Sequence, residues 1–240
     1  MTKRAVVLAA GRGNRLERRT DACAKSLVPL AGKPLIHHVL ASLAGAGISE
    51  AIIVIGYHGD QIRASLGDGH ELGLTLRYVW NTDYRRGNAS SLWCALPFVA
   101  GEPFLLVMGD HISSPTLLRS FLAGTDGHSA LAIDRSELSD EVVAEATKVE
   151  LLDGRVVDIG KGLSRWHALD TGFSYWVPGA FSGAREPPPS GELAAQMADE
   201  ARQGRLVALD VSGHFWLDID TEDDLRAAEE LLKPKEQQPV

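Results

Sequence analysis

The feature of this sequence that most constrains its fold is the alternation of continuous apolar runs with helical patterns over its first 134 residues. A continuous apolar run is typical of a strand buried on both faces, and such strands belong to parallel sheets covered by helices on both sides. Such runs lie at 5–9, 51–55, 104–108 and 130–133, and a further predicted strand at 74–79 includes Thr75 and Arg77. The helical patterns lie at 34–43, 59–66, 90–99 and 115–122. The alternation predicts an α/β fold with a largely parallel central sheet.

The pattern changes after residue 134. Strands at 147–151 and 155–159 flank Asp153-Gly154, a dipeptide that favours a two-residue hairpin. Further strands are expected at 171–177 and 206–211, and helices at 192–203 and 221–232, the last capped by Thr221. We expect a smaller antiparallel insertion on the α/β core, one domain over residues 1–232, and a flexible tail at 233–240.

Composition and charge exclude several classes of protein. With 45% hydrophobic and 23% charged residues, the chain is too apolar for a disordered protein. No uncharged apolar run approaches the ~20 residues needed to cross a bilayer. A net charge of -8 without a concentrated basic block disfavours non-specific nucleic-acid binding. Two cysteines cannot form a disulfide framework, so we expect a cytoplasmic protein with no membrane insertion and no nucleic-acid partner.

The sharpest chemical motif is the glycine-containing loop at 8–16, directly after the first strand. Its small residues let the backbone approach a ligand closely, and consecutive N–H groups in such a loop bind phosphates. Arg15 offers a planar donor fork for phosphate oxygens, and Lys25 supplies a second cation ten residues later. A dinucleotide fingerprint would need a third glycine where Leu16 stands. Taken alone, a G-x-G after a strand is more often an ordinary turn than a phosphate-binding loop.

Polar groups follow other predicted strands. The small polar segment 87–91 precedes a helix, where its N–H groups could meet a base or phosphate, or Asn88 or Ser90 could simply cap the helix. Asp110 follows the fourth strand and could hold Mg²⁺ or cap a turn. Asp218 and Asp220 alternate along one predicted strand and should share a face, although acids also favour the start of the last helix.

These residues together resemble a known family. L-A-A-G-x-G-x-R-L at 8–16, followed by Lys25, is similar to the triphosphate loop of the sugar-phosphate nucleotidyltransferases, and the resemblance covers essentially the whole chain. One departure is Ala24, where the family usually has proline. The resemblance implies a Rossmann-like, three-layer fold with a mixed, mostly parallel sheet. It also implies a nucleotide-binding half at about 1–134 and an acceptor-binding half at about 135–220.

The resemblance assigns roles to individual residues. The implied nucleotide-binding set is Leu8, Ala9, Ala10, Gly11, Gly13, Asn14, Arg15, Lys25, Asn81, Gly87, Asn88, Ser90, Ser91 and Asp110. The implied cofactor is Mg²⁺, held by Asp110 together with Asp218 or Asp220. The implied catalytic cations are Arg15, Lys25 and Lys161, which would stabilise charge on the reacting phosphates.

The segment from 134 to 173 resembles the inositol-1-phosphate cytidylyltransferases within this family. An acid-rich loop, E-A-T-K-V at 145–149, the Asp153-Gly154 hairpin, G-K at 160–161 and D-T-G-F at 170–173 follow one another in the same order. The implied acceptor-binding set is Asp134, Glu145, Lys148, Lys161, Asp170, Thr171 and Gly172. The implied reaction is cytidylyl transfer from CTP to myo-inositol-1-phosphate, which gives CDP-inositol and pyrophosphate.

Several alternatives stay open at this level. The acceptor could be a hexose-1-phosphate, phosphocholine or an aminophosphonate. A glycosyltransferase would normally show D-x-D after the fourth strand, where Gly109-Asp110-His111 stands instead. A nucleotide-sensing regulatory subunit would be expected to have lost its metal-binding acids. The eight histidines show no metal-ligand spacing and are interpreted as structural or surface residues, and a homodimer is possible.

Overall fold

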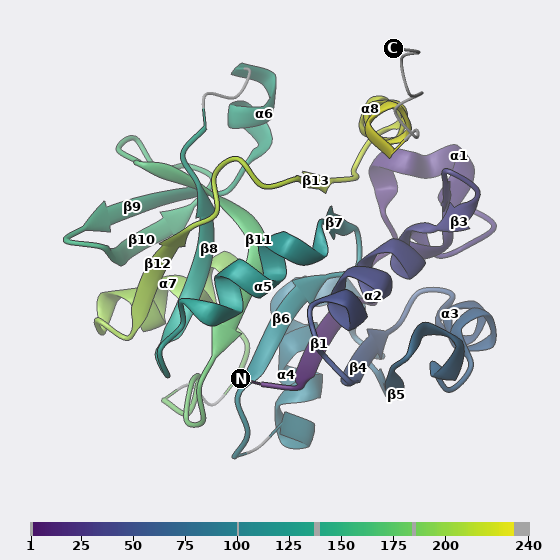
Figure 1. The fold of residues 1–240 in the computed structure, drawn as a ribbon, viewed down its shortest axis with the longest axis horizontal. Coiled ribbons are helices and arrows are strands. Elements are labelled where there is room, and N and C mark those ends of the chain that lie inside the picture. Colours follow the sequence, from purple (N-terminus) through teal and green to yellow (C-terminus); the bar gives the residue numbers. More distant parts are fainter. Residues whose placement is uncertain (1, 100, 137–139, 184–185, 233–240) are drawn as a thin grey trace, which may run out of the picture.

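The computed structural model describes residues 2–99, 101–136, 140–183 and 186–232, so the predicted tail at 233–240 lies outside the described residues. The strands of its main sheet are β1 (Arg4–Ala9), β4 (Glu50–Ile55), β5 (Thr75–Trp80), β6 (Phe104–Met108), β8 (Ser129–Asp134), β9 (Lys148–Leu152), β10 (Arg155–Gly160), β11 (Ala168–Trp176) and β12 (Leu206–Asp210). Their order is β5-β4-β1-β6-β11-β8-β12-β10-β9 (Figure 1). All of these described strands run in one direction except β10 and β11, which confirms the mixed, mostly parallel sheet.

The sheet has a point where the chain reverses its direction of winding. From β1 the chain crosses to β4 on one side, and it later returns to place β6 on the other side of β1. Both neighbours run parallel to β1, so the loops that leave β1 and β6 diverge at the same edge. A crevice forms at such a position, and ligands of open α/β sheets bind there.

Helices cover both faces of the sheet, as the apolar runs predict. Alternate residues of β1 point in opposite directions, and both sets are buried. Val7 belongs to the core under α2 (Leu35–Gly45) and α5 (Pro115–Ala123), whereas Val6 belongs to the core under α4 (Asn88–Val99) and α7 (Leu193–Arg202). Figure 1 shows α2 and α5 on the near face and α4 on the far one. The remaining helices are α1 (Glu17–Thr20), α3 (Gly59–Leu66), α6 (Asp140–Glu145) and α8 (Glu222–Leu232).

The second half forms the antiparallel part of the sheet. β9 and β10 pair through a turn in which Asp153 and Gly154 both have positive φ, as the dipeptide predicts. β9 also pairs with β11, so β11, β8, β12, β10 and β9 close into a ring. The prediction of an acid-rich loop before Glu145 was wrong, because residues 140–145 form α6.

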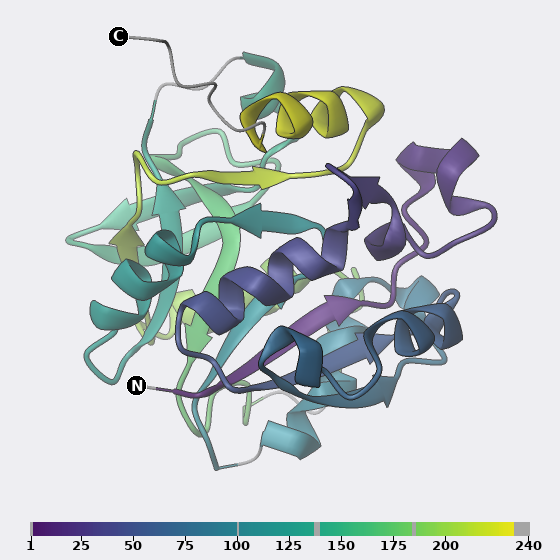
Figure 2. The same ribbon diagram turned by 45° about the vertical axis from the view of Figure 1, so that its right-hand side comes forward.

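A small two-stranded sheet lies at the edge of the crevice. β7 (His111–Ser113) pairs antiparallel with β13 (Trp216–Asp218), with His111 opposite Asp218. The yellow β13 runs beside the teal β7 in Figure 2. The expectation that Asp218 and Asp220 share one strand was wrong. β13 ends at Asp218, so Asp220 lies beyond the strand, although the Ile219 N–H still donates to the Asp110 carbonyl at 3.1 Å.

A short antiparallel pair, β2 (Pro29–Leu30) and β3 (Lys33–Pro34), leads into α2. At the other end of the chain, the Thr221 hydroxyl accepts the Asp224 N–H while the Asp224 carboxylate accepts that of Thr221, which confirms the predicted cap of the last helix. No helix in the described ranges is long and apolar enough to span a membrane.

The loops before α4 and α7 are in tight contact. The Ala89 N–H donates to the Gly191 carbonyl at 3.0 Å, and the Leu193 N–H donates to the Asn88 side chain at 2.7 Å. Gly191 has a φ of +71°, and a Cβ placed on it would lie 1.8 Å from the Arg86 carbonyl oxygen. Only glycine fits here, so this contact fixes the second half of the chain against the loop at 87–91.

Gly191→Ala should therefore destabilise the protein more than backbone strain alone does. Gly204 has nearly the same φ, +70°, but open space where a Cβ would go, and it is the matched control. Gly204→Ala should cost about 1–2 kcal/mol of unfolding free energy from the left-handed conformation. Gly191→Ala should cost about 1–3 kcal/mol more, because the backbone must also move apart. Urea denaturation of both variants measures this, and equal losses would contradict it.

Candidate active site

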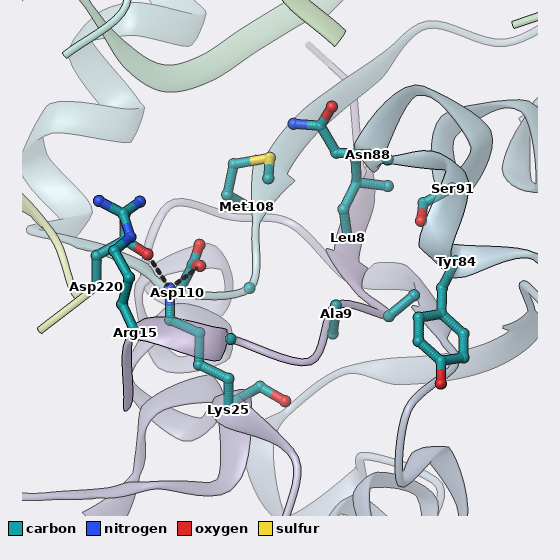
Figure 3. Close-up of a pocket in the computed structure, with 16 residues that line it drawn as sticks. Leu8, Ala9, Arg15, Lys25, Tyr84, Asn88, Ser91, Met108, Asp110 and Asp220 are labelled. Carbon is teal, nitrogen blue, oxygen red and sulfur yellow. Dashed lines mark hydrogen bonds and ion pairs between the residues drawn. The ribbon is translucent and has the colours of Figure 1, made fainter. Parts of the chain in front are cut away.

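A pocket of about 490 Å³ opens in the crevice between the carboxyl ends of β1 and β6 (Figure 3). Its wall contains most of the predicted nucleotide-binding residues, namely Leu8, Ala9, Ala10, Gly11, Gly13, Arg15, Lys25, Gly87, Asn88, Ser91 and Asp110. The predicted nucleotide-binding set did not include Ser26, Tyr84, Met108 and Gly109, which also line the pocket. Segments far apart in the sequence thus build one cavity.

Lys25 lies at the centre of the charged end of this pocket. Its Nζ is 2.5 Å from Asp110 Oδ2 and 2.5 Å from Asp220 Oδ1, and its side chain is only 9% exposed (Figure 3). Burial by itself lowers the pKa of Lys25, but the surrounding carboxylates, Asp110 foremost, outweigh burial and hold that pKa above its usual value. The ammonium is therefore charged at neutral pH and balances two acids that approach it from different segments.

The glycine loop packs directly on Lys25. A Cβ on Gly13 would lie 2.7 Å from the Lys25 Cβ, and Gly13 has a φ of +72°. A larger residue at this position would displace the lysine stem. The loop and the cation thus form one unit.

Arg15 extends the charged end toward the opening. It is paired with Asp220 and, at 3.1 Å, with Glu145, and about half of its side chain is exposed. These two acids lie on different segments, one beyond β13 and one at the end of α6. Arg15 therefore connects the glycine loop to the second half of the chain, with donors left near solvent for an incoming anion.

Beside Lys25 lies a cluster of Asp110, His111 and Asp218. His111 Nδ1 is 3.0 Å from Asp110 Oδ1 and 3.5 Å from Asp218 Oδ1. Burial lowers the pKa of His111, but Asp218 and Asp110 raise it to about 9. Burial raises the pKa of Asp110, yet Lys25 and His111 outweigh it and hold that pKa well below its usual range. Burial, with the neighbouring acids, raises the pKa of Asp218 to about 6.

The donor set of this cluster fits a divalent cation. Ligand atoms of Asp110, His111 and Asp218 lie within 4.8 Å of one another. Asp218 Oδ1 is buried and has no hydrogen-bond partner among the described residues. Carboxylate oxygens are the ligands that Mg²⁺ prefers. The geometry favours Asp218 as the second acid beside Asp110, because Asp220 is already engaged by Lys25 and Arg15.

A second, larger pocket of about 1000 Å³ adjoins the first. Of the predicted acceptor-binding residues it is lined by Asp134, Glu145, Lys161, Asp170 and Gly172. The two pockets share the wall formed by Arg15, Asn88, Met108, Asp110 and Asp220. Two ligands, one in each pocket, would therefore come into contact at the charged centre.

Two predicted nucleotide-binding residues lie beneath the first pocket. Asn81 is 1% exposed, and its Nδ2 donates to the Ser90 and Ser91 hydroxyls at 2.9 and 3.0 Å. The Ser90 hydroxyl in turn donates to the Gly87 carbonyl at 2.7 Å. Asn81 and Ser90 are absent from the pocket wall and shape the loop from below, because their polar groups are used internally. The Asn14 side chain lies outside the described part of the structure.

Two predicted acceptor-binding residues also face elsewhere. Thr171 is fully buried, and its hydroxyl donates to the Ala132 carbonyl at 2.8 Å. Lys148 Nζ donates to the Lys161 carbonyl at 3.2 Å, and neither Lys148 nor Thr171 lines the second pocket. Lys148 supports the segment that carries Lys161. The order of segments along the chain predicts proximity, but it does not specify where each side chain points.

Asp134 lines the second pocket, but its oxygens are engaged by the protein. One accepts the Ser136 N–H at 2.7 Å, and the other accepts Trp216 Nε1–H at 2.7 Å. Burial raises the pKa of Asp134, and these hydrogen bonds outweigh it and lower that pKa overall. Because Trp216 is the first residue of β13, Asp134 holds the segment that brings Asp218 to the centre.

Sequence reasoning missed the role of His111. It interpreted all histidines as structural or surface residues, yet His111 lies within the acid cluster and lines the second pocket. Its position next to Asp110 was a usable signal. The pairing of β7 with β13, which brings His111 to Asp218, was not visible in the sequence.

Burial destabilises the charged form of the Asp170 carboxylate. Burial raises its pKa to about 6, although the Gly172 N–H, which donates to Asp170 Oδ1 at 2.8 Å, acts in the opposite direction. The folded protein therefore binds the proton of the Asp170 carboxyl group more tightly than the unfolded chain does. Protonation of Asp170 therefore stabilises the folded protein fully below the unfolded pKa of about 4. This stabilisation is lost as pH rises through about 6.

Asp170→Asn should therefore stabilise the protein at neutral pH. The unfolding free energy should rise by about 1–3 kcal/mol at pH 7 and change little at pH 4, because the amide retains the acceptor for Gly172 without the buried charge. Urea denaturation at both pH values measures this change in unfolding free energy. Asp126→Asn, in an exposed turn, is the control for the Asp-to-Asn change itself. Equal behaviour of the two variants would contradict the assignment.

Comparison with known proteins agrees with this geometry. The model of the MobA-like NTP transferase domain matches residues 5–159. The bifunctional IPC transferase and DIPP synthase of Rubrobacter xylanophilus is 36% identical over 95% of this chain, which spans 51% of that protein's length. The CMP-5'-(3-aminopropyl)phosphonate synthase of Streptomyces rubellomurinus is 32% identical over 99% of this chain and 40% of its own length.

A solved structure of another protein has the same fold. The inositol-1-phosphate CTP transferase of T. maritima superimposes with a TM-score of 0.84 at 28% identity, covering 100% of this chain and 98% of that one. The fold, the glycine loop with its lysine, and the family model that matches more than half of the sequence agree. This chain belongs to the MobA-like NTP transferase family.

Proposed function

We propose that this chain is a Mg²⁺-dependent cytidylyltransferase that uses CTP and myo-inositol-1-phosphate and releases CDP-inositol and pyrophosphate. The observation that carries the proposal is the wall shared by the two pockets, with Arg15 and Asp110 in it. Such a wall suits a transfer between two ligands that meet at one charged point. The names of the Rubrobacter and T. maritima proteins support CTP and an inositol phosphate as those ligands.

In this proposal the triphosphate occupies the smaller pocket and the acceptor the larger one. An acceptor phosphate oxygen forms a bond to the α-phosphorus, and the bond from that phosphorus to the bridging oxygen breaks, so that pyrophosphate leaves with the electron pair. An ionised phosphate is already a nucleophile, so no general base is required. Catalysis then rests on positioning and charge stabilisation by Arg15 and Lys25.

Asp110 would hold Mg²⁺ together with Asp218, which the geometry favours over Asp220 as the second acid. When bound, Mg²⁺ neutralises charge on the triphosphate. The acids alone would repel a triphosphate, and Lys25 offsets two of them in the free protein. Lys25 is thus suited both to hold the two carboxylates together in the folded protein and to bind phosphate oxygens.

The larger pocket supports a hydroxyl-rich acceptor with one phosphate. Lys161 is exposed at its wall and would bind the acceptor phosphate. Asp170 has a carboxylate oxygen that accepts the Gly172 N–H and lines the same pocket, and carboxylates accept hydrogen bonds from ring hydroxyls. A site built around such bonds rejects an analogue that leaves these groups unpaired.

One observation favours a second acceptor class. The wall of the larger pocket is rich in acids, among them Glu145, Asp170 and Glu192, whereas Lys161 is the single lysine among the described residues that line it. This charge balance also suits an acceptor that carries an ammonium group. The relative named as an aminopropylphosphonate synthase supports an aminophosphonate as that alternative.

The two lysines should serve different substrates. Lys25→Ala should reduce kcat/KM for CTP by about 100- to 1,000-fold, the cost of losing one charge-stabilising group. Lys161→Ala should raise the KM for the acceptor and lower kcat, with the CTP KM nearly unchanged. Pyrophosphate release at varied concentrations of each substrate separates the two. Lys33→Ala, at an exposed position outside both pockets, is the control. Identical kinetic defects in both variants would contradict the division of roles.

A competition experiment decides the acceptor. CTP is mixed with equal concentrations of inositol-1-phosphate, glucose-1-phosphate, phosphocholine and 3-aminopropylphosphonate, and the products are identified by mass spectrometry. CDP-inositol should dominate. A different dominant product would overturn the acceptor while leaving the nucleotidyltransferase proposal in place. Replacing CTP by each other nucleoside triphosphate tests the base in the same way.

A further inference from the structure

Ser26 has a hydroxyl that the folded chain leaves without a partner. It directly follows Lys25 in the short helical turn Lys25–Leu27, and it is 4% exposed. Its Oγ is buried and makes no hydrogen bond to any described residue. Ser26 nevertheless belongs to the wall of the smaller pocket, beside Gly11, Gly13 and Lys25.

This arrangement is unfavourable in the free protein. Most buried polar atoms in native proteins have a hydrogen-bond partner, and an unsatisfied one destabilises the fold. Other buried serines of this chain follow the rule. The Ser42 hydroxyl donates to the Ser113 carbonyl, and the Ser91 hydroxyl accepts from Asn81. A buried hydroxyl without a partner, on a residue that lines a cavity, points to a ligand that supplies the missing partner.

The location of Ser26 indicates which part of a ligand that is. Ser26 lines the smaller pocket but not the larger one, so it lies away from the acceptor. In an in-line transfer, the attacking oxygen and the leaving pyrophosphate are on opposite sides of the α-phosphorus. A donor next to the glycine loop and Lys25, on the side away from the acceptor, is therefore expected at the leaving phosphates rather than at the attacking oxygen.

We infer that the Ser26 hydroxyl donates a hydrogen bond to the β- or γ-phosphate of the bound triphosphate, and so to the pyrophosphate that leaves. This inference rests on the proposed function and adds a binding residue to the same site. It also explains why an unsatisfied hydroxyl is kept here, because the ligand completes a bond that the free protein lacks. The bond is charge-assisted, and such bonds are stronger than neutral ones.

The test compares binding with stability in Ser26→Ala and Ser26→Cys, neither of which has a strong donor. Isothermal titration calorimetry with Mg²⁺ present measures the binding of CTP, pyrophosphate and CMP to each protein. Both variants should bind CTP and pyrophosphate about tenfold or more weakly than wild type. Their affinity for CMP, which lacks the β- and γ-phosphates, should stay within about twofold of wild type. Without ligand, Ser26→Ala should melt at the same temperature as wild type or higher, because an unsatisfied buried group is gone.

Ser42→Ala is the matched control, since it removes a buried hydroxyl that has a partner, Ser113, and neither residue lines either pocket. It should lower the melting temperature and leave pyrophosphate affinity unchanged. If wild type binds neither CTP nor pyrophosphate, the proposed function itself fails. If wild type binds both and Ser26→Ala binds pyrophosphate equally well, the Ser26 inference is overturned. An equal loss of CMP binding, or a melting temperature lowered as in Ser42→Ala, would also overturn it.

Discussion

The ammonium group of Lys25, held between Asp110 and Asp220, is the interaction on which the site depends. A charge with so little exposure is stable only when it is paired, and each partner comes from a different part of the chain. The pairing joins the glycine-loop segment, the end of β6 and the loop beyond β13 at one point. Removing Lys25 would leave two partly buried carboxylates without the ammonium between them, so the cluster fixes the crevice as well as its chemistry.

The arrangement of the sheet explains why these segments meet. β1 and β6 are neighbours and parallel, so the glycine loop and Asp110 leave the sheet at the same edge. β13 reaches this edge by pairing with β7, and Trp216 is held there by Asp134. Asp134 thus shows how a polar residue in a pocket wall contributes by holding another segment in place. The second half of the chain supplies most of the larger pocket, and the contacts of Gly191 with Arg86 and Ala89 keep it against the first half.

Several groups in the site make the empty protein less stable than it could be. Asp170 and Asp218 both have a pKa raised to about 6, with burial as the first cause, and the Ser26 hydroxyl lacks a partner. These groups surround the shared wall of the two pockets or line the pockets themselves. Polar groups left unsatisfied or destabilised in this way are typical of binding sites, because the ligand completes their interactions. The distribution of unfavourable groups thus marks the same region as the pockets do.

The sequence alone determined the features that depend on neighbours along the chain. The apolar runs predicted each central strand, Asp153-Gly154 predicted its hairpin, and the motif at 8–16 with Lys25 predicted the phosphate-type loop, because each pattern expresses a local preference or a recognisable motif. Contacts between distant segments were decided only by the tertiary structure. The β7–β13 pair, the place of His111 in the acid cluster and the separate directions of Asp218 and Asp220 all depend on such contacts. The inward orientation of Asn81 and Thr171 also required the folded chain, since periodicity places a residue on a strand or helix but does not choose the partner of a side chain.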